Sequence, residues 1–316
     1  MHKKPTVGIV VLNYNGGELT VQCIKSLVKN TDHNFKTILV DNGSTDGSLE
    51  KAKSELKGIT IISLKENYGF SKGMNMGAWY LLKHHMPKYV MFVNNDMRFP
   101  PGQKDWLSTL IKDLEEDPIA ATVFPKFKYF NGQIVYSGAN YATNVLGAVT
   151  RSPIKESSKK QHINCGYAGI VLIKTKVLQK IGLFDERFSP FWYEDFDLDR
   201  RIEKAGHKIL YEPAITLYHA ESLTLKKIGQ TKGQDYMKNI EKRNFIRYAY
   251  KHYPARPFAI AALYWLARQF VQRKDNGYAL RNPFKSIGQK MIDLRREKVR
   301  LNDNEATNRI KEIIQL

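Results

Sequence analysis

The sequence has 316 residues, enough for one large domain or two modest ones, and its apolar and charged fractions of 42% and 26% are ordinary for a globular protein. The formal net charge of +19 is high, and residues 221–316 alone hold 21 Lys and Arg against 9 Asp and Glu. Such a charge favours nucleic acid, an anionic membrane surface or phosphorylated ligands as partners, and it says nothing about fold. Two distant cysteines exclude a disulfide framework, and the absence of a run of about 20 apolar residues excludes a predicted membrane span.

The first residues, MHKKPTVGIVVLNYNGG, combine a basic start with an apolar run of only strand length. They lack the longer apolar region and the small-residue cleavage site of a signal peptide. A reducing cytoplasm is therefore the expected location.

Strands and helices alternate over the first hundred residues. Apolar, β-branched runs predict strands at 7–12, 37–40, 59–64 and 89–93, and amphipathic segments between them predict helices that end near residues 30, 57 and 85. Ser44, Thr45 or Asp46 is expected to cap the second helix. This alternation predicts a doubly wound α/β unit.

A polar turn follows each of the four strands. The turns read NYNGG, DNGSTDG, ENYGF and NND, in chain order. The carboxyl ends of parallel strands share one edge of a sheet, and open α/β sheets bind ligands along that edge. The four turns therefore predict a ligand site.

A different pattern begins near Pro118. It predicts a hairpin of strands 120–129 and 133–136, a mobile basic loop at 150–161, a strand at 167–173 and a short helix at 176–181. A further helix is expected to end at Gly206 and to precede two strands at 209–211 and 215–218.

The stretch FSPFWYEDFDLDRR, residues 188–201, places Glu194, Asp195, Asp197 and Asp199 in six positions behind an aromatic run. Like charges and partial desolvation both raise carboxyl pKa values, so four ionised acids here are costly. One interpretation is a helix N-terminus, where the dipole favours acids. The sharper interpretation is that Asp195 is a catalytic base at the mouth of a pocket.

These motifs occur in a fixed order over residues 5–225: VVLNYNGG, ILVDNGSTDGS, ENYGFSKGMNMG, FVNNDM, GYAGIVLIKTKVLQKIGLFDERF, FWYEDFDLDRR and LYHAESLT. The ordered set resembles the inverting family 2 glycosyltransferases of the GT-A fold, most of all the bacterial rhamnosyltransferase-like members. The resemblance implies that residues 1–225 form a Rossmann-like mixed sheet, the nucleotide-diphospho-sugar transferase fold. Residues 226–316 are then a basic, amphipathic helical extension.

The resemblance implies a dTDP- or UDP-sugar donor. Asp41 would accept a hydrogen bond from the imide N–H of the base, although it could instead start a local turn. Gly69, Gly73 and Gly77 are expected to let the backbone approach a ligand closely. Six polar or glycine positions in the matching motifs, Gly69 among them, are predicted to bind the donor or to line its site: Asn13, Asn67, Gly69, Lys72, Asn95 and Gly169.

Asn94-Asn95-Asp96 occupies the place of the family's Asp-x-Asp metal motif, with asparagine instead of the first aspartate. The resemblance makes Asp96 the one carboxylate ligand of Mg²⁺ or Mn²⁺, with much of the coordination left to the diphosphate. His219 matches the position of a third ligand in some relatives, although a lone histidine is equally expected to be structural.

Asp195 would then take a proton from an acceptor hydroxyl as the hydroxyl attacks the anomeric carbon, with inversion. Glu194 is expected to touch the acceptor or to position Asp195. Trp192 and Tyr193 offer faces on which a sugar could stack, or they belong to the core. Asp197 and Arg200 are expected to hold the helix in place.

The extension contains predicted helices at 234–252 and 257–272, and Phe258–Val271 is apolar enough to be buried or interfacial. One hypothesis is docking on the anionic inner face of the cell membrane, with a glycan or polyprenyl-diphosphate-linked acceptor. The alternative is packing on the catalytic core or in a homodimer. A catalytically inactive sugar-nucleotide-binding relative and a nucleic-acid-binding protein are the other classes, although no nucleic-acid recognition motif is present.

Overall fold

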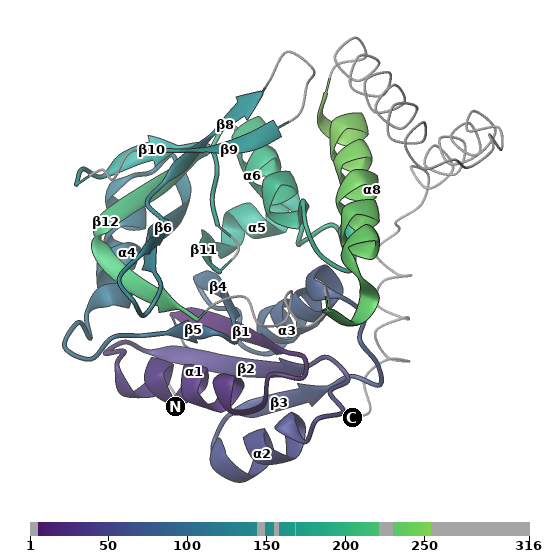
Figure 1. The fold of residues 1–316 in the computed structure, drawn as a ribbon. Coiled ribbons are helices and arrows are strands. Elements are labelled where there is room, and N and C mark those ends of the chain that lie inside the picture. Colours follow the sequence, from purple (N-terminus) through teal and green to yellow (C-terminus); the bar gives the residue numbers. More distant parts are fainter. Residues whose placement is uncertain (1–5, 144–148, 155–157, 168, 221–229, 254–316) are drawn as a thin grey trace, which may run out of the picture.

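A ten-stranded mixed sheet with helices on both of its faces forms the centre of the fold (Figure 1). The structure, a computed structural model, describes residues 6–143, 149–154, 158–167, 169–220 and 230–253. The strand order is β10-β12-β6-β11-β4-β1-β2-β3, with β5 paired to β12 and β7 paired to β6.

The strands of this sheet are β1 (Val7–Asn13), β2 (Phe35–Asp41), β3 (Thr60–Ser63), β4 (Tyr89–Asn94), β5 (Met97–Arg98), β6 (Ala120–Lys128), β7 (Ile134–Tyr136), β10 (Gln161–Ile163), β11 (Ile170–Lys174) and β12 (Lys208–His219). A separate two-stranded sheet consists of β8 (Ala139–Thr143) and β9 (Val149–Pro153).

The first four strands are parallel, and the predicted doubly wound unit is confirmed. The helices that connect them are α1 (Gly17–Lys29), α2 (Ser48–Glu55) and α3 (Phe70–His84). Alternate residues of β1 point to opposite faces of the sheet: Val10 and Leu12 approach α3, whereas Asn13 bonds to Thr20 of α1. The polar turns after these strands consequently meet at one edge.

Gly73 and Gly77 of α3 serve helix–sheet packing, and the predicted ligand approach at these two positions stays a prediction. A Cβ at Gly73 would lie 2.4 Å from Leu12 Cδ1, and a Cβ at Gly77 would lie 2.4 Å from Val10 Cγ1. Side chains there would separate the helix from the sheet.

The expected cap of α2 takes another form. Gly47, with a φ of 80°, is the N-cap residue, and the Asp46 carboxylate accepts a hydrogen bond from the Ser48 amide two residues on. Asp46 therefore satisfies an amide at the helix start from one position outside the cap.

The second half of the sheet is mixed. β11 is antiparallel to both β4 and β6, and β12 runs parallel to β6. The two strands predicted at 209–211 and 215–218 are one strand, β12, whose register shifts between Glu212 and Thr216. Pro213 lacks an N–H for the ladder, so the chain bulges there and then continues in the same direction.

The predicted hairpin at 120–136 is present, with Gly132 at a φ of 85° in its turn. The predicted mobile loop at 150–161 is partly wrong, because β9 pairs with β8 and β10 pairs with β12. The structure also contains α4 (Trp106–Glu116), which packs against β6 and buries Trp106 and Leu110.

Three helices and a 3₁₀ turn complete the described chain: α5 (Thr175–Ile181), η1 (Glu186–Phe188), α6 (Glu194–Lys204) and α8 (Gln234–His252). The bounds of α8 are those predicted, and the helix lies beside α6 (Figure 1). The segment Phe258–Val271 lies outside the described residues. Among the residues described, no helix combines the length and apolarity that crossing a bilayer requires.

Candidate active site

Asn13 is the centre of a buried polar network at the carboxyl edge of the parallel strands. Its Nδ2 donates to Asp41 Oδ1 at 2.6 Å and to Ser48 Oγ at 2.9 Å. Its Oδ1 accepts from Thr20 Oγ1 at 2.6 Å and from Asn95 Nδ2 at 3.3 Å. The structure thus brings three predicted site residues, Asn13, Asp41 and Asn95, into direct contact.

Asp41 lies opposite Asn13 in the ladder between β1 and β2 and is 1% exposed. One carboxylate oxygen accepts from Asn13, and the other accepts from the Ser44 amide at 3.1 Å. The second bond is the local-turn role that the sequence leaves open. An ionised carboxylate offers about four acceptor positions, so this turn leaves Asp41 with capacity for another donor.

Asn42, which the sequence analysis does not single out, holds the loop after β3. Its Nδ2 donates to Asn67 Oδ1 at 3.0 Å and to the Gly69 carbonyl at 3.1 Å, and its Oδ1 accepts from the Tyr68 amide. Asn67 in turn accepts from the Gly69 amide at 2.9 Å. The predicted residues Asn67 and Gly69 are thereby tied to the strand that ends in Asp41.

The same loop contacts the segment that leads to the acidic helix. The Phe70 amide donates to the Pro190 carbonyl at 2.8 Å, and Ser189 Oγ donates to the Tyr68 carbonyl at 3.1 Å. A Cβ on Gly69, whose φ is 85°, would lie 2.2 Å from Ser189 Oγ. Gly69 therefore permits a close approach of two loops.

Lys72 lies on the first turn of α3, apart from the Asn13 network. Its Nζ is 4.1 Å from the centre of the Tyr68 ring, a cation–π contact. Tyr68 belongs to the loop held by Asn42, so Lys72 is beside that loop.

Asp96 and His219 face each other across the short ladder between β5 and β12. The distance from Asp96 Oδ1 to His219 Nε2 is 3.3 Å, and the two residues are 8% and 2% exposed. Burial raises the pKa of the Asp96 carboxyl, and the neighbouring His219 and Arg98 only partly oppose this. Tyr167 presents its ring to the imidazole at right angles, 5.9 Å between centroids.

The chemistry of this pair fits a divalent cation. Within the described residues, Asp96 Oδ1 and His219 Nδ1 are buried and make no hydrogen bond, although Oδ1 faces the other ring nitrogen, Nε2, at 3.3 Å. A carboxylate oxygen and an imidazole nitrogen suit Mn²⁺, and the carboxylate suits Mg²⁺. The described residues contain no group of three or more His, Cys, Asp or Glu that could hold a metal ion. A cation beside Asp96 and His219 would therefore need further ligands from elsewhere.

Gly169 adjoins the turn that carries Asn95 and Asp96. Its carbonyl accepts from the Asn94 amide at 3.0 Å, and a Cβ at this position would lie 2.8 Å from Tyr167 Cε1. The predicted site residue therefore helps to fix the turn through its backbone.

The acidic helix α6 begins after two residues in left-handed backbone conformations. Trp192 and Tyr193 have φ values of 75° and 73°, a conformation that costs a bulky residue about 1–3 kcal/mol. Glu194 and Asp195 follow as the first two residues of α6; Glu194 is buried and Asp195 is half-buried. Asp195 Oδ1 accepts from the Phe196 amide at 2.8 Å.

The other two acids of the cluster hold α6 in place. Asp197, 0% exposed, accepts from Arg201 Nε at 2.8 Å and from His252 at 2.7 Å. Asp199 accepts from the Gly166 amide at 2.7 Å. Burial acts to raise the pKa of Asp197, but His252, Arg201 and Lys251 together lower it. The expectation that crowding would make ionisation costly is therefore wrong for Asp197.

Residues 8–182 match the family model described as Glycosyl transferase family 2, which covers more than half of the sequence. The chain belongs to this family.

Two curated relatives of this family 2 glycosyltransferase are bacterial. An N-acetylglucosaminyl-diphospho-decaprenol L-rhamnosyltransferase of Mycobacterium tuberculosis is 23% identical over 67% of the chain and 75% of its own length. An uncharacterized glycosyltransferase of Haemophilus influenzae is 23% identical over 79% of the chain and 76% of its own length.

Two solved structures share the GT-A fold of this glycosyltransferase. GalNAc-T7 with UDP, GalNAc and Mn²⁺ has a TM-score of 0.58 at 18% identity, over 70% of the chain and 44% of its own. A Pyrobaculum calidifontis mannosyltransferase with GDP-Man and Mn²⁺ has a TM-score of 0.53 at 17% identity, over 93% and 81%. At these identities the likeness concerns the fold alone.

Proposed function

We propose that this family 2 glycosyltransferase transfers a sugar, with inversion, from a dTDP- or UDP-sugar to a hydroxyl of a glycan or lipid-linked acceptor in cell-surface polysaccharide synthesis. The observation that carries the proposal is the buried Asp96–His219 pair, 3.3 Å apart, with Asp96 beside Asn95 of the Asn13 network. A diphosphate bound at the carboxyl edge of the sheet would find both a cation site and a buried carboxylate, Asp41, for its base.

Asp96 and His219 would hold Mg²⁺ or Mn²⁺, with the remaining coordination from the donor diphosphate and water. When bound, the ion supplies positive charge that stabilises the leaving diphosphate. The two structural neighbours, whose names include Mn²⁺ with UDP or GDP-Man, support a divalent ion.

Asp41 would accept the imide N–H of uracil or thymine, because its carboxylate keeps acceptor capacity inside the Asn13 network. Asn67, Gly69 and Gly169 would shape the donor site through the backbone that they hold. Lys72 would approach the phosphates.

Asp195 would act as the general base. It would remove the proton of an acceptor hydroxyl as that oxygen forms the bond to the anomeric carbon and the bond to the diphosphate oxygen breaks. Glu194 would contact the acceptor, and Trp192 would stack on its sugar. The name of the mycobacterial relative, which specifies a decaprenol-linked acceptor, supports a lipid-linked acceptor here, and hence a cytoplasmic enzyme that works at the membrane surface.

Residues 1–225 would form the catalytic unit and residues 226–316 the basic extension. Helix α8 of the extension packs on the catalytic unit, which supports the alternative of packing on the core for this part of the extension.

A thermal-shift panel of UDP- and dTDP-sugars, each with and without Mn²⁺, tests the donor and the metal together. We expect one donor to stabilise the protein selectively with Mn²⁺, and Asp96→Ala to lose the Mn²⁺-dependent part. Stabilisation by a DNA or RNA oligonucleotide but by no sugar nucleotide would contradict the proposal.

Transfer from that donor to N-acetylglucosaminyl-diphospho-decaprenol, or release of its sugar to water, tests the base. Asp195→Asn should lower kcat about 100- to 10,000-fold while the donor-induced shift stays the same. Equal rates for Asp195→Asn and the wild type would reject Asp195 as the base, and donor binding without any turnover by the wild type would favour an inactive relative.

A further inference from the structure

One face of α8 contacts the segment that leads into α6. The central contact is Asn244, which is 0% exposed and lies about 50 residues from its partners in sequence. Its Nδ2 donates to three backbone carbonyls, those of Phe188 at 2.6 Å, Phe191 at 2.9 Å and Trp192 at 3.0 Å. One buried side-chain amide thus binds three carbonyls of the five-residue segment 188–192.

Two of these carbonyls belong to the peptide groups on either side of Trp192. The orientation of the two peptide groups flanking a residue defines its φ and ψ, so Asn244 holds the backbone angles of Trp192 directly. Trp192 and Tyr193 have φ values of 75° and 73°, which residues with a Cβ rarely adopt without support from surrounding structure. Glu194 and Asp195 come immediately after them.

Residues of α8 before and after Asn244 in sequence also bind this segment. Arg243 donates to the Ser189 carbonyl and Arg247 to the Arg187 carbonyl. Lys251 Nζ bridges Asp185 at 2.7 Å and Asp197 at 2.6 Å. The loop before α6 and the first turns of α6 are therefore both fastened to α8.

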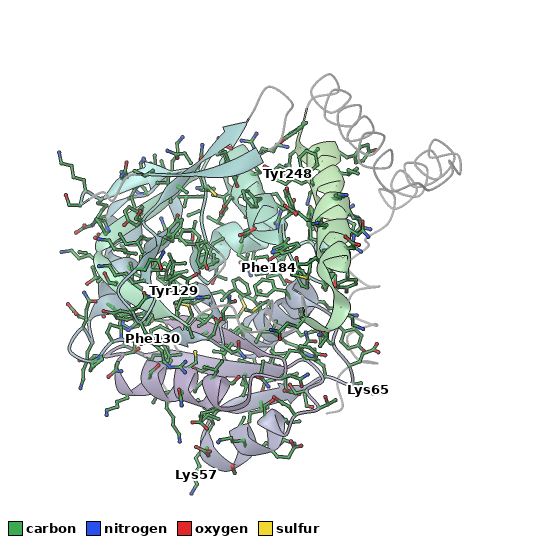
Figure 2. All side chains as sticks on the ribbon, viewed as in Figure 1. Lys57, Lys65, Tyr129, Phe130, Phe184 and Tyr248 are labelled. Atoms are coloured by element: carbon green, nitrogen blue, oxygen red, sulfur yellow. The ribbon has the colours of Figure 1, made fainter. Side chains whose placement is uncertain are left out.

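Aromatic packing adds to these polar contacts. The Tyr193 ring lies 5.7 Å from the Tyr248 ring and 6.1 Å from the Phe245 ring, centroid to centroid. Figure 2 labels Tyr248 at the place where α8 faces α6. The left-handed Tyr193 therefore has its side chain, as well as its preceding carbonyl, held by α8.

We propose that Asn244 is a positioning residue for the transfer reaction: by fixing the left-handed backbone of Trp192 and Tyr193, it aims the Asp195 carboxylate at the acceptor hydroxyl. This inference rests on the proposed role of Asp195 as the base. The hydrogen bonds of Asn13, Asp41 and Asn42 join residues between 13 and 95, and none of them involves α8. Among the described residues, the loop of Gly69 meets the 188–192 segment only through Ser189 and Pro190, so we expect donor binding to persist without Asn244.

The test compares full-length Asn244→Asp, which keeps the side-chain shape but removes the amide donors, with Asn239→Ala. Asn239 is an exposed asparagine of the same helix and provides the matched control. Assays use the donor that stabilises the wild type most, with N-acetylglucosaminyl-diphospho-decaprenol as acceptor. Asn244→Asp should lower kcat about 100-fold, because a misplacement near 1 Å has that effect, with donor affinity unchanged; Asn239→Ala should match the wild type.

A double-mutant cycle separates positioning from general stability. If Asn244 acts through Asp195, Asn244→Asp adds almost no loss of kcat in an Asp195→Asn background. Fully additive losses would overturn the proposal. If Asp195→Asn alone has no effect, the proposed function fails, whereas a large effect of Asp195→Asn with none of Asn244→Asp rejects only the role of Asn244.

Hydrogen exchange gives a readout that needs no acceptor. The amides of residues 188–195 should exchange faster in Asn244→Asp than in the wild type, and those of β1 and β2 should not change. Asn244→Ser, which retains one shorter donor, serves if Asn244→Asp does not fold, and it should show a smaller effect of the same kind. Wild-type protection at 188–195 in a folded variant would overturn the proposal.

Discussion

The two ends of the proposed site are held by different chemistry. At the donor end, neutral amides and hydroxyls surround Asp41, and every contributor from Asn13 to Asn95 sits in or beside the parallel strands. At the base end, α6 and the loop before it are fastened by charged and amide side chains of α8, which lie more than 50 residues later in sequence than their partners. The donor end is therefore a property of the sheet itself, whereas the base end depends on a helix from another part of the chain.

The largest expected effect on stability is that of a substitution at Asp197, at the base end. Asp197→Asn removes the carboxylate that Arg201, Lys251 and His252 share, and leaves cationic groups partly buried without their partner. The free energy of unfolding should fall by about 3 kcal/mol, measured by chemical denaturation. Nucleotide-induced stabilisation should persist, because the donor end does not use α8.

Glu203→Gln is the matched control for that change. Glu203 pairs with Arg200 on the exposed side of the same helix, with the two side chains 42% and 31% exposed. Its loss should cost no more than about 1 kcal/mol. Equal destabilisation by the two variants would mean that the buried cluster does not fasten α6.

Asn13→Ala instead removes the central hydrogen-bonding side chain of the donor end. It leaves Asp41, Ser48 and Thr20 without a shared partner in a buried place, which should lower the free energy of unfolding by about 2 kcal/mol. It should also weaken donor binding, seen as a smaller thermal shift, while hydrogen exchange at 188–195 stays as in the wild type. Faster exchange at 188–195 would show that the two ends are not independent. Asn239→Ala again serves as the exposed control.

The smallest expected effect is a loss of stability at the base end at low pH. The Arg187 and Lys251 side chains hold the pKa of Asp185 far below its ordinary value against the effect of burial, and the pKa of Asp197 is also lowered. A lowered folded-state pKa stabilises the protein above the ordinary value of about 3.9, and this stability is lost as pH falls through the lowered value. The protection factors of residues 188–195, which are corrected for the pH dependence of intrinsic exchange, should therefore fall below about pH 4, less so in Asp197→Asn.

A result of the opposite sign, with residues 188–195 opening as pH rises from neutrality, would contradict this account. His252 does not alter the sign, because burial lowers its pKa although Asp197 opposes that shift, and a lowered histidine pKa also makes the folded state less stable as pH falls. Its Nδ1 faces Lys204 Nζ at 3.1 Å while its Nε2 faces Asp197.

The sequence predicts well that Asn13, Asp41 and Asn95 lie together, because the determinants of this arrangement are local. Continuous apolar runs specify the parallel strands, the turn after each strand carries its polar residue, and the geometry of a parallel sheet brings these turns together. Asn42 shows the limit of this reasoning: it adjoins Asp41 in the same turn, yet its buried position and its bonds to Asn67 and Gly69 appear only in the fold.

The base end is less predictable because its partners are backbone carbonyls and distant charges. Nothing in the sequence around Asn244 indicates that it donates to the carbonyls of Phe188, Phe191 and Trp192. Every residue has a backbone carbonyl, so the residue types of these partners give no signal. The bounds of α8 follow from its sequence, but its docking face does not. β12 shows a related limit, because Pro213 suggests a break where the strand only bulges.

The chain order of these two ends has a consequence for synthesis. When the first hundred residues have left the ribosome, β1 to β4 and the Asn13 network are complete and can fold together, since domains generally fold from the N-terminus during synthesis. The loop before α6 must wait for Asn244, more than 50 residues later. A nascent chain would thus complete the Asn13 network before the backbone that precedes Asp195 is fastened.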